Sequence, residues 1–333
     1  MRARTLVATP ALLALLTLPL AACSDDENTL LDGPRGGVEA PAQSASPAAG
    51  TQTSGTRTVT HAKGSTEVPA APQRIVTLDS PILDAAIFLG LKPVGAVRTS
   101  VDTGISEYLA DRTEGVEIVG EIAKPNLEAI AALQPDLILS STLRDDALYD
   151  KLSAIAPTVF ANGPGTAWRE DFLLVGEALN RGQEARDALA DFDRRASELG
   201  DRLGLKDADA TIMRFLPGET RVYGPDSFSG SVLRAVGLGA PDLAYDQFAI
   251  ARLSSEELTR ADADILFTTT YGAEDETTRG EVTPLWGRLQ AVQKGCQFDV
   301  DDDTWMVGIG LIGATAILDD LEAKLSEGDC GRD

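Results

Sequence analysis

The sequence predicts an α/β protein with two lobes that are joined by one long backbone helix, leaving a ligand cleft between the lobes. Three observations predict this fold class. Short apolar strands alternate with short helices over residues 74–160, and the alternation resumes over residues 211–325. Between these stretches, residues 168–203 are helical in pattern and carry almost no strand signal. Because such alternation indicates a parallel sheet covered on both faces, each lobe is expected to be Rossmann-like.

The first lobe is expected to span residues 58–165. Its expected strands are Arg74–Leu78, Pro93–Val97, Glu117–Val119, Asp136–Ser140 and Thr158–Phe160. Its expected helices are Asp84–Leu89, which Gly90 closes, Leu127–Leu133 and Ala147–Ile155.

The connecting segment is expected at residues 166–206, with an interruption near Asn180. In its second half, apolar residues recur at helical spacing; these are Ala185, Ala188, Leu189, Phe192 and Leu199. An ordinary crossover helix would show the same spacing, but the length of the segment and its position between two α/β halves favour a connecting rod. A single stiff helix resists hinge bending, so closure of the cleft is expected to be small.

The second lobe is expected at residues 207–333 and to repeat the logic of the first. Its expected strands are Thr211–Phe215, Arg221–Tyr223, Asp264–Thr269 and Cys296–Val300. Its expected helices are Ser229–Val236, Ser255–Arg260, Leu285–Ala291 and Ile309–Leu325.

The N-terminal residues have the features of an export signal. Arg2 and Arg4 precede an uncharged run from Ala11 to Leu20, which is shorter than the roughly 20 apolar residues that span a bilayer. A charged start, a short apolar middle and small residues at the end indicate a signal peptide, here residues 1–22.

The cysteine that follows is expected to carry a lipid. The run Leu20-Ala-Ala-Cys23 resembles the lipobox of bacterial lipoproteins, in which the Cys thiol is acylated before cleavage. A cysteine at this place in an ordinary signal peptide is the alternative. Residues 23–57 are poor in large apolar side chains and are expected to form a disordered tether.

Composition excludes several classes of function. The formal net charge of −23 argues against nucleic acid as a partner, because such partners need basic patches. The chain has one histidine, His61, at the edge of the tether. A serine hydrolase and a zinc or manganese carrier therefore lack their central residue, and neither an enzyme nor a resident metal or cofactor is expected.

Two cysteines remain after Cys23. Cys296 and Cys330 are an even pair in an exported chain, which usually forms a disulfide. The expected bond ties the last helix to a nearby strand. Two buried free thiols are the alternative.

Two motifs suggest ligands but lack the required context. Gly308, Gly310 and Gly313 match the dinucleotide-binding glycine pattern, yet only one helix follows them, whereas that pattern opens a βαβ unit. We expect these glycines to let the last helix start close against the lobe. Asp299, Asp301 and Asp303 suggest a calcium loop but lack the glycine and the final glutamate, so a solvated acidic turn is expected.

Several phrases, in this order and spacing, resemble a known family, the periplasmic binding proteins with a helical backbone that bind ferric siderophores, haem or vitamin B12. They are Arg74-Ile-Val-Thr-Leu, Pro125-Asn-Leu-Glu-Ala-Ile, Leu133-Gln-Pro-Asp-Leu-Ile, Tyr223-Gly-Pro-Asp-Ser-Phe-Ser-Gly-Ser-Val-Leu, Leu253-Ser-Ser-Glu-Glu-Leu, and Trp305 followed by Gly308. The resemblance covers residues 58–327. The phrase that begins at Tyr223 is similar to the corresponding segment of family members that bind siderophores.

The resemblance implies a monomeric solute-binding lipoprotein on the outer face of the cytoplasmic membrane. It would bind a ferric siderophore and deliver it to the permease and ATPase of an ABC importer. A protein of the same fold that binds haem or a corrinoid is one alternative. A cell-envelope lipoprotein without a role in transport is another.

The resemblance also implies a set of ligand contacts, namely arginines that follow or lie in strands and aromatic residues at strand ends or loops that the family turns toward the ligand. Their placement agrees with the rule that ligands of open α/β sheets bind outside the carboxyl ends of strands. The candidates are Arg98, Arg144, Arg214, Tyr223, Phe248, Tyr271 and Trp305. For each one, a surface ion pair or a place in the core is the alternative. As a set they favour a large, flat, anionic ligand, since guanidinium groups bind carboxylate or catecholate oxygens and rings stack on the chelator.

The resemblance also implies a docking surface for the permease. In the vitamin B12-binding relative, one glutamate on each lobe meets arginines of the permease, and the matching phrases place Glu128 and Glu256 in these positions. Glu257 could replace Glu256. A glutamate favoured at a helix start by the helix dipole is the alternative for each.

Overall fold

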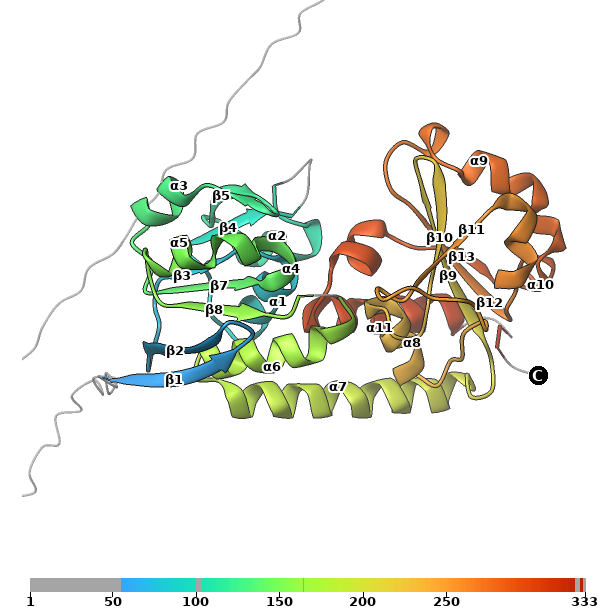
Figure 1. Ribbon diagram of the computed structural model, residues 1–333. Helices are drawn as coiled ribbons and strands as arrows, with labels where there is room; N and C mark the ends of the chain where they lie inside the picture. The colour runs from blue at the N-terminus through green and yellow to red at the C-terminus, as the bar shows by residue number, and fades with distance from the viewer. Residues whose placement is uncertain (1–54, 100–103, 164, 327–329, 332–333) are drawn as a thin grey trace, which may run out of the picture. The chain divides into compact units, whose positions relative to one another are not determined.

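The computed structural model describes residues 55–99, 104–163, 165–326 and 330–331 (Figure 1). The expected signal peptide and Cys23 lie outside these residues, as does nearly all of the expected tether. Within the described ranges, no helix has both the length and the apolar character needed to cross a membrane.

An antiparallel hairpin that the sequence did not predict opens the described chain. It pairs β1 (Thr56–His61) with β2 (Gly64–Pro69), so β1 begins within the residues expected as tether. The buried ring of His61 accepts a hydrogen bond at Nδ1 from the backbone N–H of Phe160 at 3.2 Å and pairs through Nε2 with Thr66 Oγ1 at 2.9 Å. The one histidine therefore joins the hairpin to the first sheet.

The first sheet is parallel, as predicted, apart from one short edge strand. Its order is β6-β5-β4-β3-β7-β8, and only β6 runs antiparallel to its neighbour. The strands are β3 (Ile75–Thr77), β4 (Gly95–Arg98), β5 (Glu117–Glu121), β6 (Lys124–Pro125), β7 (Leu137–Ser141) and β8 (Thr158–Ala161). Chain order reverses between β3 and β7, which is the switch point where doubly wound sheets bind ligands.

Short helices accompany this sheet. They are α1 (Ser80–Phe88), α2 (Ala110–Thr113), α3 (Leu127–Ala132), α4 (Thr142–Asp145) and α5 (Tyr149–Ser153). Asp79 caps α1 and Pro81 occupies its first turn, where a missing N–H costs nothing. Asn126 caps α3 by accepting from the N–H groups of Glu128 and Ala129. The helix expected at 147–155 is shorter, because residues 146–148 form a 3₁₀ turn.

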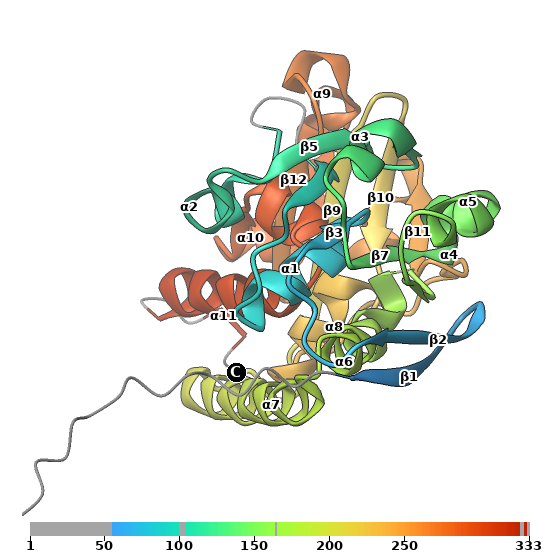
Figure 2. The same ribbon diagram turned by 90° about the vertical axis from the view of Figure 1, so that its left-hand side faces the viewer.

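The connecting segment consists of α6 (Trp168–Ala178) and the long helix α7 (Gly182–Leu203). Asn180 has a positive φ of 58°, which produces the expected interruption. Buried residues follow one face of α7 at the predicted helical spacing and include Ala185, Leu189, Phe192, Ala196 and Leu199. The helix contacts α6, α8 and α11 (Figure 2), so it touches elements of both halves of the chain.

The second sheet corrects the expectation that the second half repeats the first. Its order is β11-β10-β9-β12-β13, and β10 runs antiparallel to both of its neighbours. The strands are β9 (Ala210–Leu216), β10 (Glu219–Tyr223), β11 (Ile250–Leu253), β12 (Ile265–Thr270) and β13 (Gln297–Asp299). A tight turn with Gly218 at φ 78° joins β9 to β10, and so short a link permits only antiparallel pairing.

The helices of the second half are α8 (Phe228–Ala235), α9 (Arg279–Val282), α10 (Gln290–Gln293) and α11 (Leu311–Leu325). The helix expected at 255–260 is present as a 3₁₀ helix, Ser255–Ala261. One expectation was wrong. The helix expected at 285–291 is broken at Leu289, whose backbone is extended.

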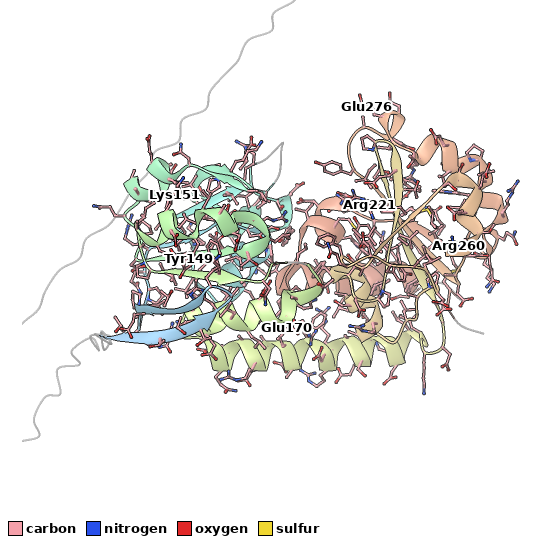
Figure 3. The ribbon with its side chains drawn as sticks, viewed as in Figure 1. Tyr149, Lys151, Glu170, Arg221, Arg260 and Glu276 are labelled. Atoms are coloured by element: carbon pink, nitrogen blue, oxygen red, sulfur yellow. A yellow bond between two sulfur atoms is a disulfide. The ribbon has the colours of Figure 1, made fainter. Side chains whose placement is uncertain are left out.

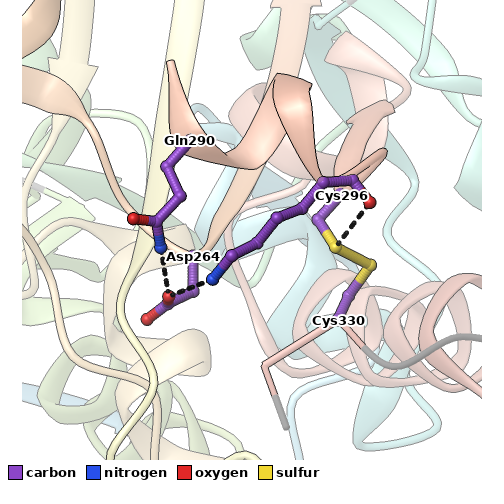
Figure 4. Close-up of a disulfide and its surroundings, with 5 residues drawn as sticks. Asp264, Gln290, Cys296 and Cys330 are labelled. Carbon is purple, nitrogen blue, oxygen red and sulfur yellow. Dashed lines mark hydrogen bonds and ion pairs between the residues drawn. A yellow bond between two sulfur atoms is a disulfide. The ribbon is translucent and has the colours of Figure 1, made fainter. Parts of the chain in front are cut away.

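The predicted disulfide between Cys296 and Cys330 is present, with Cα atoms 5.5 Å apart (Figure 4). Cys296 precedes β13, and Cys330 follows α11. Beside it, Asp264 accepts one hydrogen bond, from Gln290 Nε2 at 2.9 Å, and pairs with Lys294 at 3.5 Å. The disulfide therefore fixes the C-terminal residues to the edge of the second sheet.

The glycines before α11 let the helix start in close contact, as predicted, and the structure shows that the contact is with the first lobe, which the sequence did not specify. The fully buried carboxylate of Asp84, on α1, accepts hydrogen bonds from the N–H groups of Ile312 at 3.0 Å and Gly313 at 3.2 Å. A Cβ on Gly310, whose φ is +150°, would lie 2.3 Å from the Asp84 Cγ. The N-terminus of α11 is an anion-binding site that an internal carboxylate already fills.

The acidic turn at 299–303 is bonded and not simply solvated, which corrects the prediction. Asp299 pairs with Arg279 at 2.7 Å. Asp303 accepts from the backbone N–H of Glu107 at 2.8 Å and so forms a second tie between the lobes. In the part of the chain that the structure describes, no group of His, Cys, Asp and Glu side chains is placed to hold a metal ion.

We predict that the protein becomes more stable as the pH falls from 7.5 to 5. Burial raises the pKa of Asp84 to about 7, above its ordinary 3.8, although backbone N–H groups oppose the shift. The folded state therefore binds more protons between these values, and stability decreases by up to about 1.4 kcal/mol per pH unit as the pH rises through that window.

Thermal melting of Asp84→Asn at each pH tests this prediction. The variant should show a shallower decrease of Tm with rising pH than the wild type, because it lacks the titrating group. Asp171, whose pKa burial raises to about 6, leaves a residual slope in both proteins. Equal slopes in the two proteins would show that Asp84 does not titrate in this range.

Candidate functional site

A cavity of about 380 Å³ has walls from both lobes. The first lobe contributes Leu143 and Arg144, and the segment that follows β8 contributes Gly165 and Thr166. The second half contributes Arg221, Tyr223, Ser227, Phe228, Ser229, Phe248, Ile250, Arg252, Met306 and Ile309. Its size falls within the roughly 300–1,000 Å³ of small-molecule sites.

A larger hollow of about 570 Å³ lies beside α7. Its lining includes four carboxylates, Glu184, Asp187, Asp191 and Glu198. Its two arginines, Arg194 and Arg195, pair with carboxylates on the exposed surface. We take the cavity between the lobes as the candidate site, because it lies beside the switch point of the first sheet and its lining combines three arginines with Tyr223 and Phe248 and includes no carboxylate among the described residues.

Arg144 reaches this cavity from the switch point of the first sheet. It lies on α4, directly after β7, and its Nε donates to Asp79 Oδ1 at 3.2 Å. Asp79 follows β3, is completely buried, and also accepts from Ser141 Oγ at 2.8 Å and from the N–H of Ser80 at 2.9 Å. Burial raises the pKa of Asp79, and the Arg144 charge opposes the shift. Asp79 thus fixes one edge of Arg144 while the side chain lines the cavity.

Three arginines form a row across the second sheet. Arg221 on β10 lies directly opposite Arg214 on β9 and opposite Arg252 on β11 (Figure 3 labels Arg221). Cross-strand partners project from the same face, and like charges in such positions are destabilising. This arginine row therefore requires anions near it.

Protein carboxylates supply those anions. Arg221 donates to Glu219, and Arg252 donates to Glu219 at 3.0 Å and to Asp246 at 2.8 Å. Arg214 forms a two-bond pair with Asp302, with Nε and Oδ1 2.7 Å apart. Burial acts to lower the pKa of Arg214, but the bonds and charge of Asp302 outweigh it and the pKa is raised.

The expected aromatic contacts divide into two groups. Tyr223 and Phe248 line the cavity, and Phe248 is 41% exposed. The ring of Tyr271 is 49% exposed and lies 4.9 Å from the Arg214 guanidinium, which also donates to the Tyr223 hydroxyl at 3.4 Å. Arg214 and Tyr271 are thus neighbours of the cavity and not part of its lining.

Trp305 occupies a different place from the one expected. Its side chain is fully buried, its ring lies 4.8 Å from that of Phe267, and its Nε1 donates to Asp320 at 2.9 Å. The expectation that it faces the ligand is corrected, because the core of the second half encloses it. Arg98 ends β4 and is exposed, outside the lining of the cavity.

The two expected docking glutamates are exposed at the starts of their helices. Glu128 lies in the first turn of α3 and Glu256 in the first turn of the 3₁₀ helix at 255–261. Glu257 forms a capping box with Ser254 and pairs with Arg260 at 2.7 Å. These bonds make Glu257 the weaker alternative of the two neighbours.

Sequence reasoning missed Arg221 and Arg252. A signal for Arg221 was present, since Glu219, Arg221 and Tyr223 alternate along one face of β10. Arg252 could not be placed because β11 itself was not predicted. The register that sets the two arginines opposite each other depends on a pairing of strands about 30 residues apart in sequence.

Two α/β sheets bridged by one helix, with a cavity lined from both lobes, define a solute-binding protein. The chain belongs to the periplasmic binding protein family, which it matches over residues 75–304. This match confirms the family and the two-lobe α/β fold expected from the sequence.

Several relatives are similar over most of the chain. The "Probable siderophore-binding lipoprotein YfiY" of Bacillus subtilis is 40% identical, over 80% of this chain and 87% of its own. The achromobactin-binding periplasmic protein of Dickeya dadantii is 31% identical, over 75% of this chain and 85% of its own. The crystal structure of Staphylococcus aureus SirA complexed with staphyloferrin B has a TM-score of 0.72 at 30% identity and covers 81% of this chain and 99% of that chain.

Proposed function

We propose that this chain is the solute-binding component of an ABC importer and that it binds a ferric siderophore in the cavity between its lobes. The observation that carries the proposal is the cavity lining, where Arg144, Arg221 and Arg252 meet Tyr223 and Phe248. A cationic and aromatic wall in a chain of net charge −23 favours an anionic chelate over a cationic or apolar ligand.

The names of the relatives support the same ligand class. They include a siderophore-binding lipoprotein and an Fe(3+)-citrate-binding protein, both of Bacillus subtilis. The matched family is one of binding proteins, and we propose a monomer that carries its ligand without transforming it. The chelate is cargo, released to the permease whose ATPase drives import.

Each cavity residue has a proposed role. The three lining arginines bind the oxygens of the chelate, and the rings of Tyr223 and Phe248 stack on its flat parts. Arg214 and Tyr271 lie beside the lining of the site, where Arg214 adds a further positive charge. Arg98 ends β4 outside the lining of the cavity, and its contact with the ligand is a proposal that rests on the resemblance alone.

We predict that Arg144→Ala weakens binding of the chelate about tenfold or more, because a charge-assisted bond at a partly desolvated site contributes about 1.5–3 kcal/mol. Quenching of tryptophan fluorescence by ferric hydroxamate, catecholate and carboxylate siderophores, haem and cobalamin measures it. Arg194→Ala, in the hollow beside α7, is the matched control and should bind as the wild type does. If haem or cobalamin binds most tightly, that compound and not a siderophore is the ligand. If only the Arg194→Ala control loses binding, the ligand binds in the hollow beside α7 and not in the cavity between the lobes.

We propose that the mature protein is anchored through a lipid on Cys23 at the outer face of the cytoplasmic membrane. Relatives named as lipoproteins or periplasmic proteins indicate a place in the cell envelope. Stable anchoring needs more than one acyl chain, which diacylation of the thiol provides.

Cys23→Ala should release the protein from membranes or leave it unprocessed, as fractionation of cells and mass spectrometry of the N-terminus would show. Retention of a correctly processed variant in the membrane fraction would contradict a lipid at this residue.

We also propose that Glu128 and Glu256 dock the permease. Complementary charges chiefly set orientation and encounter rate, so reversing both, Glu128→Arg with Glu256→Arg, should abolish uptake of iron chelate by cells. Ligand affinity of the purified double variant should not change, because neither residue lines the cavity. Normal uptake would show that these carboxylates serve only as helix starts.

A further inference from the structure

One carboxylate joins the two neighbouring arginines of the cavity wall. Oε1 of Glu219 accepts from Nε of Arg221 at 2.8 Å and also from its Nη2. Oε2 of the same group accepts from Nε of Arg252 at 3.0 Å. Glu219 itself is absent from the residues that line the cavity, whereas both arginines line it. The carboxylate therefore contacts the two guanidinium groups from outside the cavity.

The positions of these bonds decide which donors remain. A guanidinium has five N–H donors in a planar fork. Glu219 engages the Nε side of both arginines, and Asp246 takes Nη1 of Arg252 at 2.8 Å. Among the hydrogen bonds of the described residues, Nη1 of Arg221 and Nη2 of Arg252 make none to a protein carboxylate. Arg221 also forms a hydrogen bond with the Tyr223 side chain. Each arginine still keeps at least two of its five N–H donors for a ligand.

We propose that Glu219 is a positioning residue that fixes Arg221 and Arg252 as a paired carboxylate-binding site, and that the imported ferric chelate presents carboxylate groups to this pair. The inference rests on the proposed function and narrows its ligand class. A planar pair of N–H donors matches the two oxygens of a carboxylate. A hydroxamate or a catecholate binds iron through both of its oxygens, whereas a polycarboxylate chelate can present carboxylate groups that iron does not engage.

The spacing of the pair adds a second constraint. Directly opposed residues of an antiparallel ladder have Cβ atoms about 4.5–5.5 Å apart, so two guanidinium groups of this pair can contact neighbouring carboxylates of one small chelate. Holding two like charges this close requires an anion between them, which Glu219 supplies before ligand arrives. The anchor removes rotamer freedom from both arginines, and that lowers the entropy lost on binding.

The direction in which Glu219→Gln changes the affinity for the chelate shows whether Glu219 acts by positioning the arginines or only through its charge. Glu219→Gln removes a negative charge beside the site, so Coulomb attraction alone would strengthen the binding of an anionic chelate. Loss of positioning would weaken it instead. Asp226→Asn is a matched control, because Asp226 pairs with Arg234 on the exposed surface at 2.6 Å and touches neither cavity arginine.

Fluorescence titrations of the purified full-length protein would use ferric citrate, ferrioxamine B and ferric tris-2,3-dihydroxybenzoate as carboxylate, hydroxamate and catecholate probes. We expect the wild type to bind ferric citrate most tightly. Glu219→Gln should weaken ferric citrate by about tenfold and weaken whatever binding the other probes show by less than threefold, which is about 0.65 kcal/mol. Asp226→Asn should not weaken it. A double-mutant cycle with Arg221→Ala should show that the two losses are not additive.

Four results would overturn the inference. If the wild type binds the hydroxamate or catecholate probe more tightly than ferric citrate, the proposed carboxylate class is wrong, although the proposed function still holds. Unchanged or tighter binding of ferric citrate by Glu219→Gln would show that the carboxylate only competes with ligand. An equal loss for all probes would show a general structural role. Failure of every ferric probe to bind would reject the proposed function itself, and the inference with it.

Discussion

The arrangement of the two lobes depends on a buried carboxylate that belongs to one lobe and caps a helix of the other. Asp84 accepts from the N–H groups of Ile312 and Gly313, where the dipole of α11 favours negative charge. Only a residue without a side chain fits at Gly310, because a Cβ there would overlap Asp84. In dinucleotide-binding proteins this glycine pattern makes room for a phosphate, whereas here it makes room for the Asp84 carboxylate of the same chain. The cavity walls on either side keep their places through this contact, the bond between Asp303 and Glu107, and the packing of α7 on both halves.

The acidic composition and the cationic cavity are compatible because each arginine near the site has a carboxylate partner. Arg144 has Asp79, Arg214 has Asp302, and Arg221 and Arg252 share Glu219. Such pairs allow four cations to lie close together without a ligand. They also limit which ligands bind, since an anion must use the donors that these partners leave over. Affinity is therefore expected to depend on the geometry of the oxygens in the chelate more than on its total charge.

Local pattern was sufficient to predict much of the fold. The apolar run around Ile75, the helical spacing from Ala185 to Leu199, and the Cys296–Cys330 pair each carry their signal within a short stretch or in residue type. The strands β9 and β10 were both expected, but their antiparallel pairing was missed, although the Pro217-Gly218 pair between them is a turn signal. The full burial of Trp305 was missed because nothing in its neighbourhood tells a core ring from a cleft ring. The site was predicted in part: Arg144, Tyr223 and Phe248 line the cavity, whereas Arg221 and Arg252 depend on strand register, which sequence alone did not show.

The proposed function requires that the cavity between the lobes holds an iron chelate. The most direct measurement is the position of iron in crystals of the protein grown with a bound ferric siderophore, located by anomalous scattering at the iron absorption edge. We expect one strong peak inside the cavity lined by Arg144, Tyr223 and Arg252, with chelate oxygens against the arginines. A peak in the hollow beside α7, or one bound directly by protein carboxylates without a chelate, would contradict it.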